Sequence, residues 1–367
     1  MPRSLAVEGL SVRDFRNLES VEVDFGPRFN VVSGDNGQGK TNLLEAVYVL
    51  ATSRSFRTSK LGELIAIGRT TASVRGRIRE DHEEREQSVG LRRGLRAVRI
   101  DGKRPATLAA YAVRTPTAVF HPGALGLTNG AGSERRRLLD RVGLYLSAAS
   151  LGDADTYAKA IRARQRVLEA RGEAATDLDG WEELIVRHGL ALSAARTAAA
   201  ASLIPAAKRA FGRIGPAGTK LGLHYERSAP LTGDAFRAEL RKNRIRDRAR
   251  GSPGVGPHRD ELALDLDSRP VRSMASQGQH RAVVLALKLA EIEVVAEACG
   301  VRPILLLDEV SSELDRARTA ALFAALRDEP SQVLLTTTRP GLIDTGTLSG
   351  MDERRDFHVE DGRISRS

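Results

Sequence analysis

The chain has 367 residues, of which 41% are hydrophobic, and it carries 57 Lys and Arg against 47 Asp and Glu, a formal net charge of +10. A chain of this length and apolar content can bury a substantial core, which excludes disorder as its dominant state. The basic excess favours polyanionic partners, nucleic acid first, although an arginine-rich genome would give the same excess without such a partner.

The sequence indicates a protein of the reducing cytoplasm. Its single cysteine, Cys299, has no second cysteine for a disulfide and no companions for a metal cluster. The opening MPRSLAVEGL lacks an apolar signal region, and no later stretch approaches about 18 uninterrupted apolar residues. We therefore expect a soluble, cytoplasmic protein that does not enter a membrane.

The first hundred residues predict strands around one helix. Residues 5–34 alternate with a period of two, which predicts two or three strands that lead into a glycine-rich turn. A helix then follows, with Leu43, Leu44, Val47, Leu50 and Ala51 on its apolar stripe and Glu45 outside that stripe. Residues 73–102, with charged edges and glycine turns, predict antiparallel hairpins.

The middle of the chain predicts an inserted helical domain. Residues 148–250 are rich in Ala, Leu and Arg, with expected breaks near Gly172 to Gly180 and at Pro205. The segment ends in a basic run and a Gly/Pro linker, after which short strands resume at ELALDLD. We predict a head in two parts, 1–147 and 252–367, around a helical lid at 148–251.

One glycine-rich segment carries a strong phosphate-binding pattern. It satisfies G-x-x-x-x-G-K-[ST], the P-loop or Walker A motif, between a predicted strand and helix. Backbone N–H groups of such a loop surround phosphates, its lysine reaches the β- and γ-phosphates, and its hydroxyl coordinates Mg²⁺. The predicted ATP-binding residues are Gly34, Asp35, Asn36, Gly37, Gln38, Gly39, Lys40 and Thr41.

A second acidic motif completes the predicted nucleotide site. In RPILLLDEV an apolar strand delivers Asp308 and Glu309 at its carboxyl end. Asp308 fits the carboxylate that holds Mg²⁺ together with Thr41, and Glu309 fits a catalytic base that polarises the attacking water, with Lys40 as the second catalytic residue. A plain solvated strand end is the alternative for the DE pair taken alone.

The stretch before this strand distinguishes the chain from kinases and small GTPases. Ser276, Gln277, Gly278 and Gln279 look like an ABC signature, whose hydroxyl and N–H groups suit the γ-phosphate of an ATP held by a second subunit. A simple helix N-cap at Ser276 is the alternative. After Asp308, the segment Ser312 to Asp315 matches a D-loop, and SQVLLTTT matches a switch strand. Transporter-type proteins usually place a His after this strand, where the chain has Thr336, Thr337, Thr338 and Arg339.

Taken in chain order, RDFRN (13–17), the P-loop, ERRRLLD (134–140), GPHRDEL (256–262), SQGQ and SELD resemble the motifs of the RecF family of ABC/SMC-type ATPases. The resemblance covers nearly the whole chain. One departure is FHPGALGL, where the family usually has F-x-P-E-D-L, so Gly123 and Ala124 cannot supply the acid.

The resemblance implies an α/β fold: an ABC-type, SMC-like P-loop ATPase head with an inserted compact helical lid. It also implies a homodimer that forms on ATP binding, holds single- and double-stranded DNA at gaps, and is released by slow, DNA-stimulated ATP hydrolysis. The implied role is RecA loading with RecO and RecR in recombinational repair, replication-fork maintenance and the SOS response.

Several functional readings stay open from the residues. DNA contacts are plausible for Arg241, Lys242, Arg244, Arg246, Arg248 and Arg250, with a solvated loop as the alternative. His258 and Arg259 face nucleotide or DNA, or form a structural turn. An ATP-gated DNA clamp is the first functional hypothesis, ahead of a transporter motor or protein-remodelling subunit and of a small-molecule phosphotransferase.

Overall fold

A computed structural model describes residues 3–309, 331–338 and 354–366. The chain divides into two compact units, Met1–Ala124 with Val295–Ser367, and Leu125–Val294. Each unit is described by itself. The D-loop predicted at residues 312–315 lies outside the described residues, as does Arg339, one of the four residues that stand in place of the switch His.

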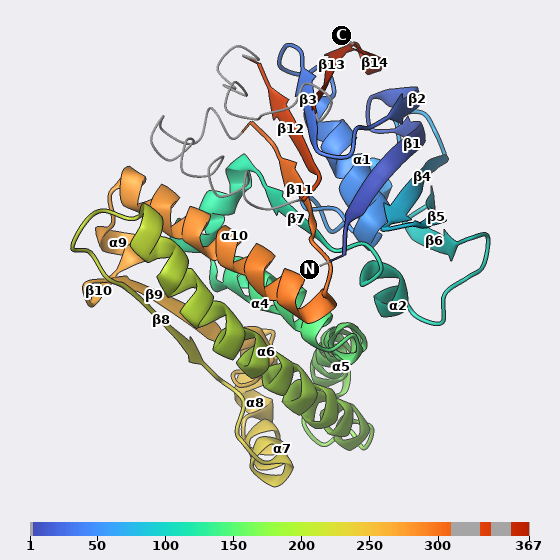
Figure 1. Cartoon of the computed structure of the whole chain (residues 1–367). Coiled ribbons are helices and arrows are strands. Elements are labelled where there is room, and N and C mark those ends of the chain that lie inside the picture. Colours follow the sequence, from blue (N-terminus) through green and yellow to red (C-terminus); the bar gives the residue numbers. More distant parts are fainter. Residues whose placement is uncertain (1–2, 310–330, 339–353, 367) are drawn as a thin grey trace. The chain divides into compact units, whose positions relative to one another are not determined.

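The first unit contains a five-stranded antiparallel sheet in the order β2-β1-β4-β5-β6 (Figure 1). Its strands are β1 (Leu5–Phe15), β2 (Leu18–Asp24), β4 (Thr71–Glu80), β5 (Glu83–Arg92) and β6 (Leu95–Ile100). Buried and exposed residues alternate along β4, as expected for a sheet with one face on a core. The predicted strands before residue 34 and the hairpins of 73–102 are confirmed.

The same unit contains a six-stranded sheet in the order β14-β13-β3-β12-β11-β7. All neighbours pair in parallel except the edge strand β14, which is antiparallel to β13. The strands are β3 (Phe29–Ser33), β7 (Thr117–Phe120), β11 (Ile304–Leu307), β12 (Val333–Thr337), β13 (Arg354–Glu360) and β14 (Arg363–Arg366). Short helical segments are η1 (Leu61–Leu64), α2 (Leu108–Ala112) and η2 (Pro122–Leu125).

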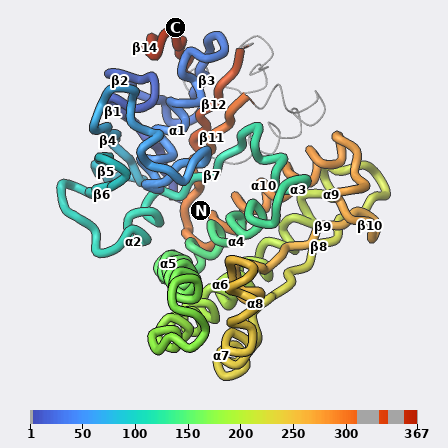
Figure 2. The backbone as a smooth tube through the Cα atoms, turned by 180° about the vertical axis from the view of Figure 1, so that it is seen from behind, coloured from blue at the N-terminus to red at the C-terminus, as the bar shows by residue number. Residues whose placement is uncertain are grey.

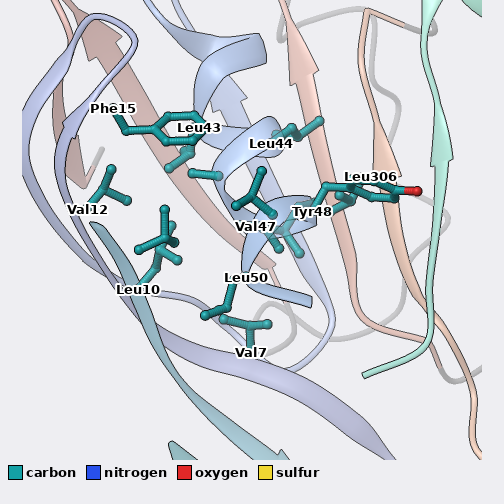
Figure 3. Close-up of a cluster of buried hydrophobic side chains, with 14 of the residues drawn as sticks. Val7, Leu10, Val12, Phe15, Leu43, Leu44, Val47, Tyr48, Leu50 and Leu306 are labelled. Carbon is teal, nitrogen blue, oxygen red and sulfur yellow. The ribbon is translucent and has the colours of Figure 1, made fainter. Parts of the chain in front are cut away.

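Helix α1 (Lys40–Thr52) is the centre of this unit's core. In Figure 3 its side chains meet those of β1, and Leu306 of β11 lies beside them. Because strands of both sheets pack against α1, nearly every position of the helix is buried rather than one stripe. Glu45, which lies outside the expected apolar stripe, is therefore fully buried as well.

The second unit consists of long helices and a three-stranded antiparallel sheet in the order β10-β9-β8 (Figures 1 and 2). The long helix α6 packs along α4 and α5 and contacts α7 and β8. Its elements are α3 (Gly126–Asn129), α4 (Gly132–Leu146), α5 (Ala149–Arg171), α6 (Leu178–Ile214), β8 (Leu221–Glu226), α7 (Gly233–Lys242), α8 (Arg244–Arg250), η3 (Pro257–Arg259), β9 (Glu261–Leu266), β10 (Arg269–Pro270) and α9 (Val271–Met274). Helix α10 (Gln277–Cys299) begins in this unit, and its residues from Val295 on belong to the first unit.

Helix α6 corrects one expectation, since it continues through Pro205. Proline removes the hydrogen bond to the carbonyl four residues earlier, but Pro205 and Ala201 are both exposed, so water can solvate the freed Ala201 carbonyl. The break expected near Gly172 is confirmed: α5 ends there with Gly172 at φ 80°.

By length and composition α6 could cross a membrane, and 44% of its most apolar window is buried inside the structure. Leu203 and Phe211 are among its buried side chains. The apolar residues of α6 thus pack in the core of the second unit.

The compact units have other limits than the predicted ranges 1–147, 148–251 and 252–367. The second unit begins earlier and ends later, because α4 packs on α5 and α6 while β9 pairs with β8. That residues 148–251 form a domain of their own stays a prediction.

Candidate nucleotide-binding site

The predicted site lies at one edge of the six-stranded sheet. Strands β3, β12 and β11 are parallel neighbours in that order, so their carboxyl ends meet at the same edge. The loop of residues 34–39 follows β3, Asp308 and Glu309 follow β11, and Thr336 lies near the end of β12. Ligands of open α/β sheets bind at this edge.

The loop after β3 has the backbone of an anion-binding turn. Gly34, Gly37 and Gly39 have φ values of 147°, 85° and 120°, a region that favours glycine. Helix α1 then begins at Lys40, and no side chain caps its first N–H groups. The positive end of α1 therefore lies directly behind the loop, as phosphate binding requires.

Lys40 is held inside the loop. Its Nζ donates to the carbonyl oxygens of Gly34 at 2.8 Å and Asp35 at 3.0 Å, and it lies 3.1 Å from Glu309 Oε1. The residue is only 5% exposed, so a buried ammonium is compensated by one carboxylate and two carbonyl dipoles. Phosphate oxygens entering the loop would compete with Glu309 for this ammonium.

Asp308 is the junction of three elements. Its Oδ1 accepts hydrogen bonds of 2.8 Å from Thr41 of α1 and of 2.8 Å from Thr336 of β12. Burial raises the pKa of Asp308 above its ordinary value, while both hydroxyl hydrogen bonds act to lower it. Thr41 and Asp308, which the sequence predicts to hold Mg²⁺ together, are thus in direct contact, and their binding of the ion stays a prediction.

Thr41 and Asp308 have the chemistry of a magnesium site. Their oxygens are hard ligands and are within hydrogen-bonding distance of each other. The described residues hold no group of three or more His, Cys, Asp or Glu side chains able to bind a metal. Two protein oxygens suit Mg²⁺, which usually keeps several waters and binds substrate phosphates.

Glu309 has a strained backbone that Thr336 supports. Its φ is 50°, uncommon for a residue other than glycine, and its N–H donates to Thr336 Oγ1 at 3.0 Å. The Thr336 hydroxyl thus bonds the Asp308 carboxylate and the Glu309 backbone N–H. The sequence names Thr336 only as one of the residues that stand in place of the switch His.

Two residues of the RDFRN segment bond the loop and helix α1, which the motif alone did not predict. Arg16 makes two hydrogen bonds of 3.0 Å to the buried Glu45 carboxylate, and Arg57 makes one of 3.2 Å. Asn17 Nδ2 donates to the Gln38 carbonyl at 3.1 Å. Arg16 and Asn17 thus hold α1 and the loop in place from the β1–β2 turn.

The SQGQ segment begins helix α10 in the second unit. Gln279 N–H donates to Ser276 Oγ at 3.3 Å, and Ser276 N–H donates to Gln279 Oε1 at 2.8 Å. This reciprocal pair is a capping box, so the helix-cap alternative describes the local geometry. Ser276 and Gln277 are exposed. Binding of a second subunit's nucleotide by this segment stays a prediction.

The ERRRLLD and GPHRDEL segments meet inside the second unit. Arg135 makes hydrogen bonds of 2.6 and 2.9 Å to Glu261, and Arg136 donates to the Asp260 carbonyl at 2.8 Å.

His258 Nε2 lies 2.8 Å from the Pro253 carbonyl, and its Nδ1 lies 2.7 Å from the Tyr157 hydroxyl. A carbonyl only accepts, so Nε2 donates, and Nδ1 of the neutral ring accepts from Tyr157. The structural-turn alternative therefore fits His258, while Arg259 is exposed.

Much of the basic run at 241–250 is neutralised within its own unit. Arg244 bonds Asp179 at 2.6 Å and Glu182 at 2.7 Å. Arg241 lies 3.2 Å from Asp179, and Arg248 lies 3.3 Å from Glu173. Paired arginines must exchange partners to bind phosphate, so the DNA contacts proposed for this run stay a prediction.

The chain resembles proteins of one family along nearly its full length. The family model described as RecF/RecN/SMC N terminal domain matches residues 6–356. The DNA replication and repair protein RecF of Anaeromyxobacter sp. (strain Fw109-5) is 41% identical over 97% of this chain and 98% of its own length. The protein of the same name from Geobacter sulfurreducens is 36% identical over 98% and 99%.

Solved structures agree with the sequence relatives. The recombination mediator protein RecF with ATP, from the RecFOR pathway, matches with a TM-score of 0.86 at 28% identity, over 100% of this chain and 99% of its own. The Smc head domain of Pyrococcus furiosus matches in fold, with a TM-score of 0.55 at 16% identity over 99% and 96%. The predicted α/β fold, an ABC-type and SMC-like head with a helical insertion, is confirmed. The chain belongs to the RecF family of DNA replication and repair proteins, within the ABC/SMC-type ATPases.

Proposed function

We propose that this protein binds ATP with Mg²⁺ at the site formed by the P-loop, Asp308 and Glu309, and that bound ATP closes a homodimer on DNA. The observation that carries the proposal is the convergence of Thr41 and Asp308 on one hydrogen bond beside the Lys40–Glu309 ion pair. Residues far apart in sequence thus supply a hydroxyl, a carboxylate, an ammonium and a candidate base at one sheet edge.

Each residue has a definite task in this proposal. The loop N–H groups and Lys40 bind the phosphates, and Thr41 and Asp308 hold Mg²⁺, which when bound neutralises charge on the phosphate oxygens. Once phosphate draws Lys40 away, the Glu309 carboxylate becomes available to orient and deprotonate a water. Until nucleotide binds, the Glu309 carboxylate stays paired with the Lys40 ammonium and does not act on water.

Dimerisation would place the exposed SQGQ segment of one protomer against the nucleotide of its partner. The capping box leaves the first N–H groups of α10 at a positive helix end, which suits a γ-phosphate. Slow, DNA-stimulated hydrolysis would then open the dimer and release the DNA.

The names of the relatives support the biological setting of the proposal. Their names describe DNA replication and repair, and the solved RecF structures belong to the RecFOR pathway. We propose that this cytoplasmic protein binds single-stranded and duplex DNA at gaps and acts with RecO and RecR in loading RecA. The net charge of +10 favours such a polyanion.

The first experiment is the light-scattering mass of the purified chain with and without ATP and Mg²⁺, each with and without duplex DNA. We expect a monomer without nucleotide and a dimer with ATP that DNA strengthens. Lys40→Ala should stay monomeric, because it loses the phosphate-binding ammonium. A wild-type chain that binds ATP and yet stays monomeric throughout would contradict the clamp.

A further inference from the structure

The hairpin of β13 and β14 lies beside β3, from which the phosphate loop emerges (Figures 1 and 2). It contacts the loop at two places. A Cβ at position 34 would collide with the carbonyl oxygen of Val359, so only glycine fits where the loop leaves β3. At the far end of the loop, the hairpin turn holds Gln38.

Gln38 is bonded on both its backbone and its side chain. Gly362 N–H donates to the Gln38 carbonyl at 2.9 Å, and Asn17 Nδ2 donates to the same oxygen at 3.1 Å. Asp361 N–H donates to Gln38 Oε1 at 2.6 Å. The Gln38 side chain therefore turns toward the hairpin, and this residue contributes to the loop through its backbone.

These contacts fix the direction of a neighbouring N–H group. In a planar trans peptide the C=O and N–H groups point in opposite directions. With the Gln38 carbonyl held by Gly362 and Asn17, the N–H of Gly39 must point away from the hairpin. Three glycines make the loop flexible, and ordering it only when a ligand binds would weaken that binding.

We propose that the turn of the C-terminal hairpin, Asp361 and Gly362, acts with Asn17 as a template that holds the phosphate loop in its anion-binding conformation before nucleotide arrives. The proposal rests on the proposed nucleotide binding. Asp361, Gly362 and Asn17 are positioning residues, since they act through Gln38.

The chain contains a matched control for this turn. Asp361 and Gly362, with φ values of 46° and 72°, form the two-residue loop of the β13–β14 hairpin. Arg93 and Gly94, at 47° and 77°, form the same kind of loop between β5 and β6. A Cβ at Gly94 would meet nothing within 4 Å, whereas one at Gly362 would collide with the Asn17 carbonyl.

The test compares Gly362→Ala, Gly94→Ala and Gln38→Met with the wild-type chain. Two quantities are measured: amide hydrogen exchange of the peptide covering residues 34–41 without nucleotide, and the dissociation constant for ATP. Gly362→Ala should accelerate exchange in this peptide and weaken ATP binding about tenfold, the size expected from losing two hydrogen bonds. Gln38→Met, which loses one, should weaken binding about threefold.

Gly94→Ala should leave both quantities unchanged, although it bears the same backbone strain. Equal exchange and equal ATP affinity in Gly362→Ala and Gly94→Ala would overturn the template. If Gly362→Ala does not fold, wild-type exchange in Gln38→Met would overturn it instead. Failure of the wild-type chain to bind ATP would refute the proposed function, while the exchange comparison would still decide the template.

Discussion

Glu45→Gln tests whether the buried carboxylate of α1 stabilises the first unit, which contains the candidate nucleotide site. Glu45 is fully buried and accepts two hydrogen bonds from Arg16, whose side chain is 19% exposed. Removing one charge of a buried pair typically costs about 3 to 5 kcal/mol, and the partial exposure of Arg16 argues for about 3 kcal/mol here. If Glu45 were solvent-exposed, the cost would stay within about 0.5 kcal/mol.

The assay is thermal unfolding of the nucleotide-free chain. For a unit of roughly 200 residues, a loss of about 3 kcal/mol lowers Tm by about 6 to 12 °C. Glu22→Gln on the exposed face of β2 is the matched control and should leave Tm nearly unchanged. The double variant Arg16→Met with Glu45→Met should regain much of the loss, because no buried charge is left unpaired and Arg57, which also bonds Glu45, is 42% exposed and can be solvated. Equal Tm values for Glu45→Gln and Glu22→Gln would refute this account of the pair.

Three further predictions concern turnover, assembly and pH. Glu309→Gln should bind ATP and accumulate an ATP-bound dimer by light scattering, since the candidate base is lost; unchanged turnover would place the base elsewhere. Ser276→Arg should bind ATP as a monomer but fail to dimerise, and loss of monomer ATP binding would contradict a signature that acts on the partner's nucleotide. Burial lowers the pKa of His258 in the folded chain. As the pH falls below about 6.5, the unfolded chain therefore binds the proton first, and the free energy of unfolding decreases until the pH reaches the folded-state pKa. His258→Gln should lack this part of the slope in unfolding measured from pH 7 downward, and parallel profiles for the two chains would show that His258 does not titrate this way.

The residues that meet at the candidate nucleotide site could be proposed from the sequence where the chemistry is local. The spacing of Gly34, Gly39 and Lys40 between a strand and a helix is specific to phosphate-binding loops. Asp308 could be placed beside Thr41 because parallel strands deliver their carboxyl ends to one edge. These inferences depend on short segments and on one general rule of sheet topology.

Features set by distant contacts could not be predicted in this way. Periodicity assigns α1 one apolar stripe, but packing between two sheets buries the whole helix and makes Glu45 an internal anion. Pro205 would break the helix if the Ala201 carbonyl, which loses its hydrogen bond, were buried away from water. This carbonyl belongs to an exposed residue, and a local pattern does not give that exposure. The contact of Gly362 with Gln38 joins residues that no local pattern relates.

The order of the strands has a consequence for synthesis on the ribosome. Both neighbours of β3 in its sheet, β12 and β13, come from segments that are translated long after it. At about 5 to 20 residues per second, roughly 300 residues of further translation take about 15 to 60 seconds. During that interval both edges of β3 lack their native partners, an arrangement that invites pairing with other nascent chains. Early binding of the nascent first strands by a chaperone would therefore aid production of this protein.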